Sequence, residues 1–170
     1  MCSSDLDEAA YEEFVRACTP SLARTAYLLT GDTHLAEDLL QHALIQVARH
    51  WERIHGRPEA YARRILATQN ISWWRSRRRR PEVALETWHD KPQPAEDPSL
   101  GLDVVAALAR LTPRQRAVLV LRYADDLTEG QVAEVLGIRP GTVKSVARQA
   151  AARMREVAPE LDPALVEENR

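Results

Sequence analysis

The stretch Leu127–Arg155, LTEGQVAEVLGIRPGTVKSVARQAAARMR, decides the fold of the second half of this chain. Thr128 can cap a helix, and a glutamine three residues later completes a capping box. Ala133 is small where two helices must cross closely. Gly137 follows four residues later, where a turn between helices favours a positive φ. Val143, ten residues after Ala133, can pack back on the first helix. This spacing predicts a helix-turn-helix.

The last helix of this stretch is predicted to have two unlike faces. At ~100° per residue, one face is apolar and consists of Val143, Val146, Ala147, Ala150, Ala151 and Met154. The opposite face consists of Lys144, Ser145, Arg148, Gln149, Ala152 and Arg155. Cations, hydroxyls and amides are the groups that bond DNA phosphates and base edges. The alternative is an amphipathic helix with a solvated basic face, but the agreement of turn and polar face favours DNA binding.

A second cationic segment, Tyr61–Arg80, ends in SWWRSRRRR. Its five last arginines would repel one another unless phosphates lie nearby, and five phosphate contacts would give a salt slope of about −4.5. Trp73 and Trp74 point about 100° apart, so we expect one to pack inward and the other to lie near DNA. Aromatic rings beside arginines suit unstacked bases. The alternatives are a core tryptophan pair and a solvated basic helix end.

Composition and charge narrow the class of protein. The chain has 170 residues and a net charge of −2, but residues 57–80 and 139–155 form two basic islands between acidic stretches. No apolar run is long enough to span a bilayer, and the acidic N-terminus argues against a targeting peptide. Cys2 and Cys18 lack metal or redox spacing, so a cytoplasmic protein is the simple expectation.

An enzyme is not expected from these residues. The chain has no glycine-rich phosphate loop, no nucleophile motif and no metal-ligand cluster. His34, His42 and His50 are eight residues apart on one predicted helix, so they drift around its surface. We therefore expect no cofactor and no metal.

Helical signals dominate and strand signals are absent, so we predict an all-α fold of two small helical domains. The first would contain three helices, about 6–29, 33–54 and 58–79, with a kink or restart at Thr19-Pro20. The second would contain four, about 100–110, 113–123, 128–136 and 140–158. We predict domains at 1–80 and 99–158, a proline-rich flexible linker at 81–98 and an acidic tail at 159–170.

The chain resembles extracytoplasmic-function RNA polymerase sigma factors of the sigma-70 family, and most closely the short actinobacterial SigE-like group. The resemblance covers nearly the whole chain and rests on motifs in the family's order. The family's region 2.1–2.2 has similar motifs here at residues 22–32 (LARTAYLLTGD) and 36–41 (AEDLLQ). Its region 2.3–2.4 is similar to residues 61–66 (YARRIL) through 72–75 (SWWR). Region 4.1 is resembled by 111–123 (LTPRQRAVLVLRY), and the region 4.2 recognition helix by 141–145 (GTVKS).

The resemblance implies a promoter-specificity subunit whose first domain binds core RNA polymerase and the −10 element, while the second reads the −35 element. The positions that match the polymerase-facing helix are Asp32, Glu37, Asp38 and Gln41. Those that match the −10 surface are Arg63, Arg64, Thr68, Gln69, Asn70, Trp73, Trp74, Arg75, Arg77, Arg78 and Arg79. Those that match the −35 surface are Arg139, Thr142, Lys144, Ser145, Arg148, Gln149 and Arg155. Expected partners are core polymerase, duplex promoter DNA, the melted −10 strand and an anti-sigma factor, with no membrane, and the free chain would be monomeric.

Two departures from the family pattern leave promoter preference open. Family members often carry Asn-Thr where this chain has Thr68-Gln69, at the place that accepts a flipped promoter base; Asn70 points elsewhere on the helix. The recognition helix often continues Lys-Ser-Arg, whereas Val146 follows Ser145 here and Arg148 supplies a cation one turn later.

The predicted linker suits two contacts with one duplex. About 20 extended residues reach at most roughly 66 Å, and boxes one and a half helical turns apart lie about 50 Å apart. We also hypothesise that its acids (Glu82, Glu86, Asp90, Glu96 and Asp97) shield the basic islands before polymerase binds. Two rival functions are a stand-alone helix-turn-helix regulator with an N-terminal sensor or dimerisation domain, and an interaction protein that binds acidic partners.

Overall fold

Two helical bundles make up the structure, a computed structural model that describes residues 2–79 and 102–159. The N-terminal bundle consists of α1 (Cys2–Thr30), α2 (Thr33–His50), a 3-10 turn (Trp51–Arg53) and α3 (Pro58–Arg79). The C-terminal bundle consists of α5 (Leu102–Ala109), α6 (Pro113–Leu119), a π-helical turn (Val120–Ala124), α7 (Glu129–Leu136) and α8 (Pro140–Val157). The described residues contain no strand, which confirms the predicted all-α class. The predicted linker and its acids, like Arg80, lie outside the described residues.

Capping residues set several helix boundaries as predicted. Asp32 caps α2, because its carboxylate accepts a hydrogen bond from the Leu35 amide at 2.8 Å. Thr112 caps α6 in a complete capping box. Gly31 adopts φ 72° between α1 and α2. The expected proline starts at Pro58 and Pro140 are also present.

Three helix predictions differ from the structure. The first helix does not restart at Pro20, because α1 continues through it. Turns on both sides of Pro20 are held by packing, with Phe14 against Trp51 and with Leu22 fully buried. The second helix ends at His50 rather than Ile54, since the last turn tightens to 3-10 geometry. The helix predicted over 113–123, α6, widens into a π-helical turn after Leu119.

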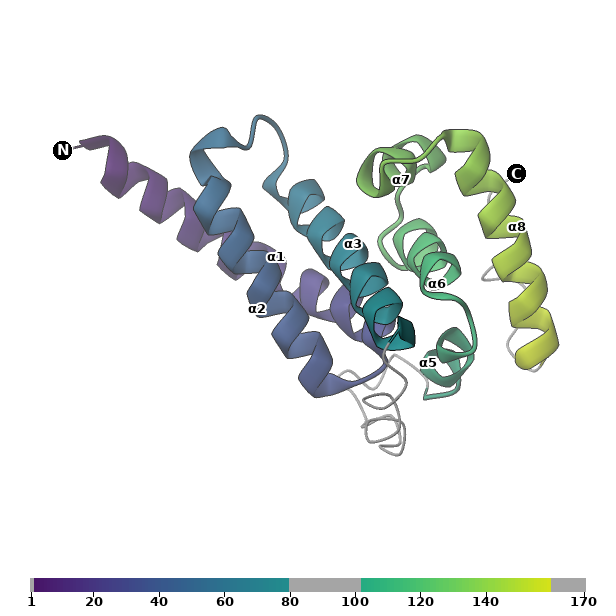
Figure 1. The fold of residues 1–170 in the computed structure, drawn as a ribbon. Helices are drawn as coiled ribbons and strands as arrows, with labels where there is room; N and C mark the ends of the chain where they lie inside the picture. The colour runs from purple at the N-terminus through teal and green to yellow at the C-terminus, as the bar shows by residue number, and fades with distance from the viewer. Residues whose placement is uncertain (1, 80–101, 160–170) are drawn as a thin grey trace.

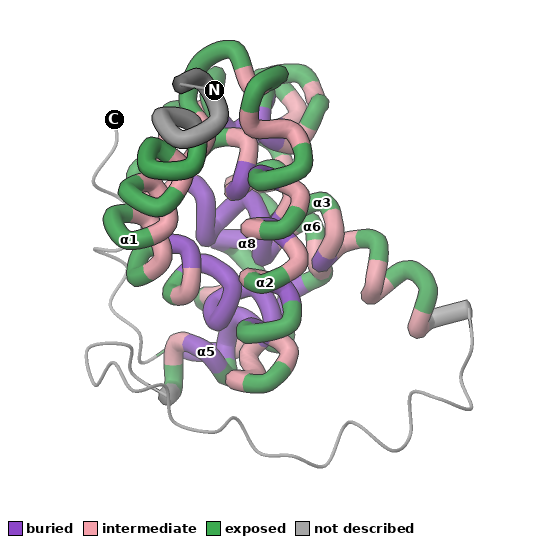
Figure 2. Tube along the Cα trace, turned by 90° about the vertical axis from the view of Figure 1, so that its left-hand side faces the viewer, coloured by how far each residue is buried: buried purple, intermediate pink, exposed green. Residues whose placement is uncertain are grey.

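One continuous apolar core joins the two bundles. The fully buried side chains include Leu22, Leu39 and Leu66 of α1–α3 and Leu121 and Val143 of the C-terminal bundle. Figure 2 shows the buried segments on the inward faces of the helices. α3 packs against α6 and α7, while the C-terminal end of α1 packs against α5 and the π-helical turn. α8 covers α6 and α7 on the side away from α1 and α2 (Figure 1).

Candidate nucleic-acid interface

The helix-turn-helix is formed by α7 and α8, and its turn has the predicted chemistry. The Thr128 hydroxyl accepts from the Gln131 amide at 3.2 Å, and the Gln131 side chain accepts from the Thr128 amide at 2.8 Å. Gly137 ends α7 in the left-handed region at φ 64°. The Ile138 amide then donates to the Ala133 carbonyl at 3.0 Å. These contacts fix how α8 leaves the turn.

α8 presents the predicted polar face to solvent. Its inner positions Val143, Ala150 and Ala151 are buried, and Val146, Ala147 and Met154 pack partly against the core. The outer positions are all exposed: Lys144, Ser145, Arg148, Gln149, Ala152 and Arg155. Arg139 at the start of α8 is exposed as well, and Thr142 is half-buried. Ser145 donates its hydroxyl to the Thr142 carbonyl at 3.0 Å. The result is an open cationic helix face.

The residues expected on the −10 surface lie on α3 and differ in how far they are exposed. Arg64, Thr68 and Arg75 are exposed, whereas Gln69 and Arg77 are half-buried. For Arg78 and Arg79 the structure describes only their place at the end of α3. The Thr68 hydroxyl donates to the Arg64 carbonyl at 2.6 Å. The exposed members therefore lie along one side of α3, because four and seven residues are close to whole helical turns.

Asn70 and the tryptophan pair make internal contacts in this arrangement. Asn70 is 1% exposed, and its amide donates to the Leu29 carbonyl of α1 at 3.2 Å. Both tryptophans are half-buried, and Trp73 packs against the core as expected of one of them. The guanidinium of Arg116 lies 5.5 Å from the ring centroid of Trp74. Such a distance permits a cation–π contact.

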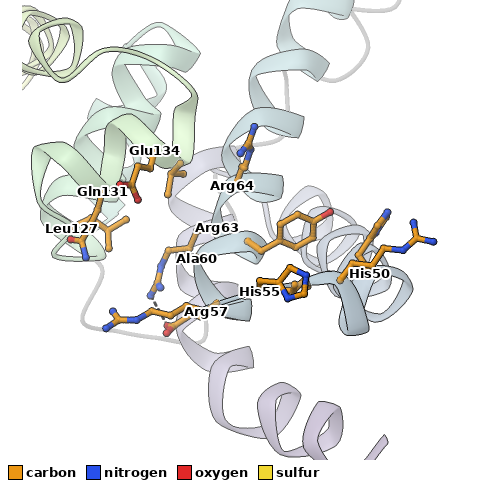
Figure 3. A pocket seen from close by; sticks show the side chains of 14 residues that line it. His50, His55, Arg57, Ala60, Arg63, Arg64, Leu127, Gln131 and Glu134 are labelled. Carbon is orange, nitrogen blue, oxygen red and sulfur yellow. Dashed lines mark ion pairs between the residues drawn. The ribbon is translucent and has the colours of Figure 1, made fainter. Parts of the chain in front are cut away.

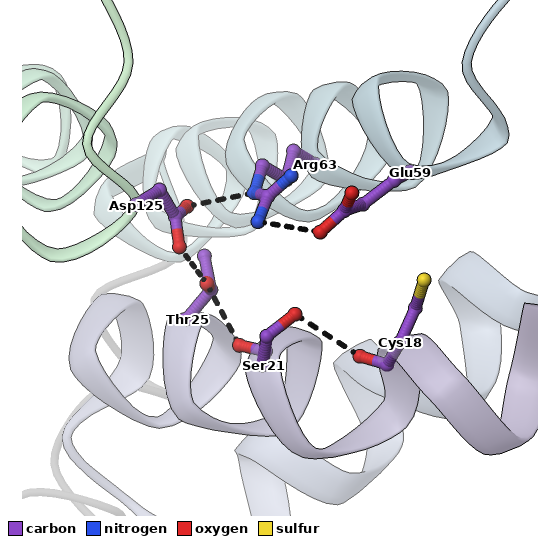
Figure 4. A network of polar contacts seen from close by, with 6 residues as sticks. All are labelled: Cys18, Ser21, Thr25, Glu59, Arg63 and Asp125. Carbon is purple, nitrogen blue, oxygen red and sulfur yellow. Dashed lines mark hydrogen bonds and ion pairs between the residues drawn. The ribbon is translucent and has the colours of Figure 1, made fainter.

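Arg63 takes part in a polar network between the two bundles (Figure 4). Its guanidinium contacts the carboxylates of Glu59 at 2.8 Å and Asp125 at 3.2 Å. Asp125 also accepts a hydrogen bond from the Thr25 hydroxyl at 2.6 Å. Burial raises the pKa of Asp125, outweighing the opposing effects of Thr25 and Arg63. Sequence reasoning missed this network, because residues 100 positions apart carry no mutual signal.

Arg116 of α6 is buried and bonds to the C-terminal ends of two other helices, α5 and α1. Its guanidinium donates to the Leu108 and Ala109 carbonyls of α5 at 2.9 and 3.2 Å, and to the Leu29 carbonyl of α1 at 2.7 Å. Burial lowers the pKa of Arg116 to about 10, so it stays charged at neutral pH. Sequence reasoning gave Arg116 no role. One indication was present in the sequence: a cation stands next to Ala117, on the side of an apolar helix that is expected to face the core.

The residues expected to face polymerase lie along the outer side of α2. Glu37, Asp38 and Gln41 are exposed, with spacings of three and four that keep Gln41 beside both acids. Asp32 is half-buried and already bonded as the helix cap. The three exposed residues form an acidic and amide surface suited to a basic partner.

Two cavities lie between α3 and the C-terminal bundle. The larger, of about 740 Å³, is lined by the start of α3, the segment before it and α7 (Figure 3). Its lining includes four arginines: Arg53, Arg57, Arg63 and Arg64. The smaller, of about 250 Å³, is lined by Thr68, Ile71, Ser72 and Arg75 of α3 together with Arg114, Leu136 and Ile138.

Other kinds of site find no support in the described parts of the chain. Among residues 2–79 and 102–159, no three His, Cys, Asp or Glu side chains are grouped closely enough to hold a metal ion. Over the same ranges, no helix combines the length and apolarity needed to span a membrane.

Comparison with known proteins gives matches along most of the chain. The family described as Sigma-70 region 2 matches residues 14–80, and Sigma-70, region 4 matches residues 102–154. The RNA polymerase sigma-E factor of Streptomyces coelicolor is 37% identical over 166 residues, covering 92% of each protein. That of Streptomyces avermitilis is 34% identical, covering 86% of this chain and 83% of the relative.

A solved structure has a similar fold. It is a co-crystal structure of the sigma factor RpoE in complex with the anti-sigma factor NepR from Bartonella quintana. The match has a TM-score of 0.75 and 25% identity, and covers 90% of this chain and 98% of the other. The similarity therefore extends over both helical bundles.

Proposed function

Because the chain belongs to the sigma-70 family, as an extracytoplasmic-function sigma factor that gives RNA polymerase its promoter specificity, we propose how its parts divide that task. Residues 1–80 bind core polymerase and the −10 element, and residues 99–158 bind the −35 element. Residues 81–98 link them, and 159–170 form a tail. The observation that carries this proposal is the exposed cationic face of α8 on a well-formed helix-turn-helix.

Reading of the −35 element is assigned to α8. Lys144 and Arg148 project from its outer face, where a guanidinium or ammonium can bond guanine edges or phosphates in the major groove. Arg139, Thr142 and Ser145 lie near the helix start, and Gln149 and Arg155 extend the face along its length. Their positions suit a helix that enters the groove by its N-terminal end.

Reading of the −10 element is assigned to α3. Arg64, Thr68 and Arg75 are exposed there, and Gln69, Trp73 and Trp74 are partly accessible. Arginines neutralise phosphates, while aromatic rings stack on unpaired bases of the melted strand. Arg63 and Asn70 belong to the same proposed surface but have internal partners in this arrangement. Arg77, Arg78 and Arg79 extend it toward the end of α3.

Core polymerase is proposed to bind α2 through Glu37, Asp38 and Gln41. Asp32 lies at the edge of this surface, because it caps the N-terminus of α2. An anti-sigma factor is proposed as a further partner, since the solved relative is in complex with one. The chain is proposed to act without a cofactor or catalytic site, as a cytoplasmic protein that is monomeric when free.

Reconstitution tests the proposed division. Purified chain is mixed with core polymerase from Streptomyces coelicolor and resolved by size-exclusion chromatography. The wild type should co-elute with core, and Glu37→Arg with Asp38→Arg should weaken association at least about tenfold, because the acidic surface becomes basic. Exposed acids of α1 provide the matched control, Glu12→Arg with Glu13→Arg. A wild-type dimer that ignores core polymerase and binds DNA alone would instead support the stand-alone regulator.

A further inference from the structure

The larger cavity is lined by more cations than anions (Figure 3). Its four arginines stand against two glutamates, and one of these, Glu59, is already paired with Arg63 at 2.8 Å. Arg53, Arg57 and Arg64 are exposed to solvent. Among the residues that the structure describes, their guanidinium groups have no ion-pair or hydrogen-bond partner. The cavity therefore presents three guanidinium groups that are available to an anion.

These three arginines come from adjoining parts of the chain. Arg53 ends the 3-10 turn, Arg57 precedes α3, and Arg64 lies about two turns farther along α3. A guanidinium offers a planar fork of donors that matches the oxygens of a phosphate. Three positive charges around one cavity repel one another, and a ligand with several negative charges removes that repulsion. The cavity therefore favours a ligand that carries more than one phosphate group.

Aromatic side chains line the same cavity. The rings of Tyr61 and His50 have centroids 6.1 Å apart and an interplanar angle of 57°. Both residues are half-buried, so part of each ring is accessible. Rings that lie beside guanidinium groups suit a stacked nucleobase. The lining therefore combines groups for phosphates with groups for a planar base.

α7 supplies the opposite wall of the cavity. Gln131 and Glu134 line it from this side and are exposed (Figure 3). An amide both donates and accepts hydrogen bonds, and a carboxylate accepts them, as the edge of a base requires. The volume of about 740 Å³ lies within the range of roughly 300–1,000 Å³ that is usual for small-molecule sites. Size and chemistry together fit a single nucleotide.

We infer that this cavity binds a nucleoside di- or triphosphate, with its phosphates on Arg53, Arg57 and Arg64 and its base against Tyr61. The inference goes beyond the proposed function, because it concerns a free small molecule and needs neither polymerase nor promoter. It gives the chain a small-molecule input in addition to its DNA-binding surfaces. A DNA backbone offers the same phosphates to Arg64 of the proposed −10 surface, so the experiment separates these two sources.

Calorimetric titration of the free, full-length chain measures binding. The probes are ATP, GTP, CTP and UTP in magnesium-free buffer, so that protein cations alone neutralise the phosphates. At least one of them should bind with a Kd below about 100 μM, and its nucleoside and pyrophosphate should each bind at least about tenfold more weakly. Absence of binding by all four, or equal binding of pyrophosphate, would overturn the inference.

Removal of two phosphate ligands locates the site. Arg53→Ala with Arg57→Ala should weaken nucleotide binding at least about tenfold, because two charge-assisted contacts are lost. Arg16→Ala with Arg24→Ala removes the same charge from exposed positions of α1 and should keep the affinity within about twofold. Equal loss in both double variants would show a response to net charge and would overturn the inference.

A carboxylate placed inside the cavity gives a second, independent test. Ala60 lines the cavity at an exposed position in the first turn of α3, where a glutamate also suits the helix dipole. Ala60→Glu should repel the phosphates and weaken binding at least about tenfold. Ala17→Glu, at an exposed position of α1, is the control of equal charge. Circular dichroism establishes folding, and Ala60→Glu decides the matter if the arginine variant does not fold. Equal affinities of Ala60→Glu and Ala17→Glu would contradict binding in the cavity.

A short single-stranded oligodeoxynucleotide identifies the source of the phosphates. Free nucleotides should bind the wild type in the absence of any DNA. If only the oligonucleotide binds, and the loss of Arg53 and Arg57 weakens it, the cavity serves promoter phosphates and the inference is wrong. Failure of the proposed function is distinguishable: a chain that binds nucleotides but directs polymerase to no promoter refutes that function alone. A chain that directs initiation normally but binds no nucleotide refutes the nucleotide site alone.

Discussion

Single residues hold the two bundles together through chemistry that sequence patterns do not reveal. Arg116 has three backbone carbonyls as partners, one of them on α1. The Leu29 carbonyl oxygen accepts hydrogen bonds from both Arg116 and Asn70, so it connects α1 to α6 and to α3. Asn70 was expected among the −10 residues, but it is buried and bonded to α1 instead of lying on the exposed side of α3.

Arg116→Met should lower the free energy of unfolding by about 2–4 kcal/mol, because the apolar side chain leaves buried carbonyls without donors. Urea denaturation of the free chain, followed by circular dichroism, measures the change. Arg114→Met at an exposed position of α6 is the control and should change stability by less than about 0.5 kcal/mol. Equal stability of the two variants would contradict the capping role of Arg116.

Asp125 should make docking depend on pH. Its pKa is raised in the docked form, so that form binds the proton more tightly than separated bundles do. Its contribution is fully present below the ordinary aspartate pKa of ~3.9 and is lost as pH rises through the raised value. The groups that face it are Thr25, Arg63 and Glu59.

Urea denaturation of the free chain should therefore show a free energy of unfolding that falls as pH rises from about 4 through the raised pKa of Asp125. The asparagine side chain of Asp125→Asn is uncharged at every pH. This variant should keep its two bundles docked and should lack the part of the pH dependence that Asp125 causes. An identical pH profile in wild type and Asp125→Asn would show that another group controls docking.

Arg148 is the residue of α8 whose loss should show most clearly in promoter choice. Arg148→Ala should cost about 1–3 kcal/mol in holoenzyme binding to a promoter fragment and relax preference in the −35 element, while association with core polymerase persists. Arg153→Ala, on the same helix but outside the proposed surface, is the control for charge. Filter binding across −35 variants measures both; equal loss of polymerase association would point to misfolding.

At the scale of elements, local chemistry predicted most boundaries and packing overrode the rest. Side-chain patterns correctly predicted three helix starts and one helix end. The starts are capped by Asp32, Thr112 and Thr128, and the end is at Gly137. The single helix predicted over 6–29 is present, whereas the restart considered at Pro20 is absent, because tertiary contacts on both sides of the proline keep the helix intact. The π-helical turn after Leu119 likewise has no signature in its residues.

Gly137 carries the turn of the helix-turn-helix through its backbone conformation. Because Gly137 has φ 64°, Gly137→Ala should lower the free energy of unfolding by about 1–2 kcal/mol. No atom lies within 4 Å of the added Cβ, so this cost comes from the backbone conformation and not from a clash. Gly141→Ala, within α8 and equally uncrowded, should be neutral or stabilising by up to about 1 kcal/mol. Thermal unfolding compares the two; equal effects would contradict the role of the turn.

At the scale of the whole molecule, the sequence indicates two helical domains but not how they dock. Each surface follows from local periodicity: the exposed face of α8 agrees with prediction residue by residue. The burial of Arg63 and the contact of α7 with α3 depend on side chains far apart in the chain, for which periodicity carries no information. The exposed face of α8 was therefore predictable, and the packing of the C-terminal bundle against α3 was not.

The most direct measurement is a map of transcript starts on genomic DNA, made with core polymerase alone and with the purified chain added. The account predicts starts that appear only with the chain, that share an upstream and a downstream box, and that weaken when Arg148 is replaced by alanine. Association with core polymerase that leaves the start sites unchanged would contradict it.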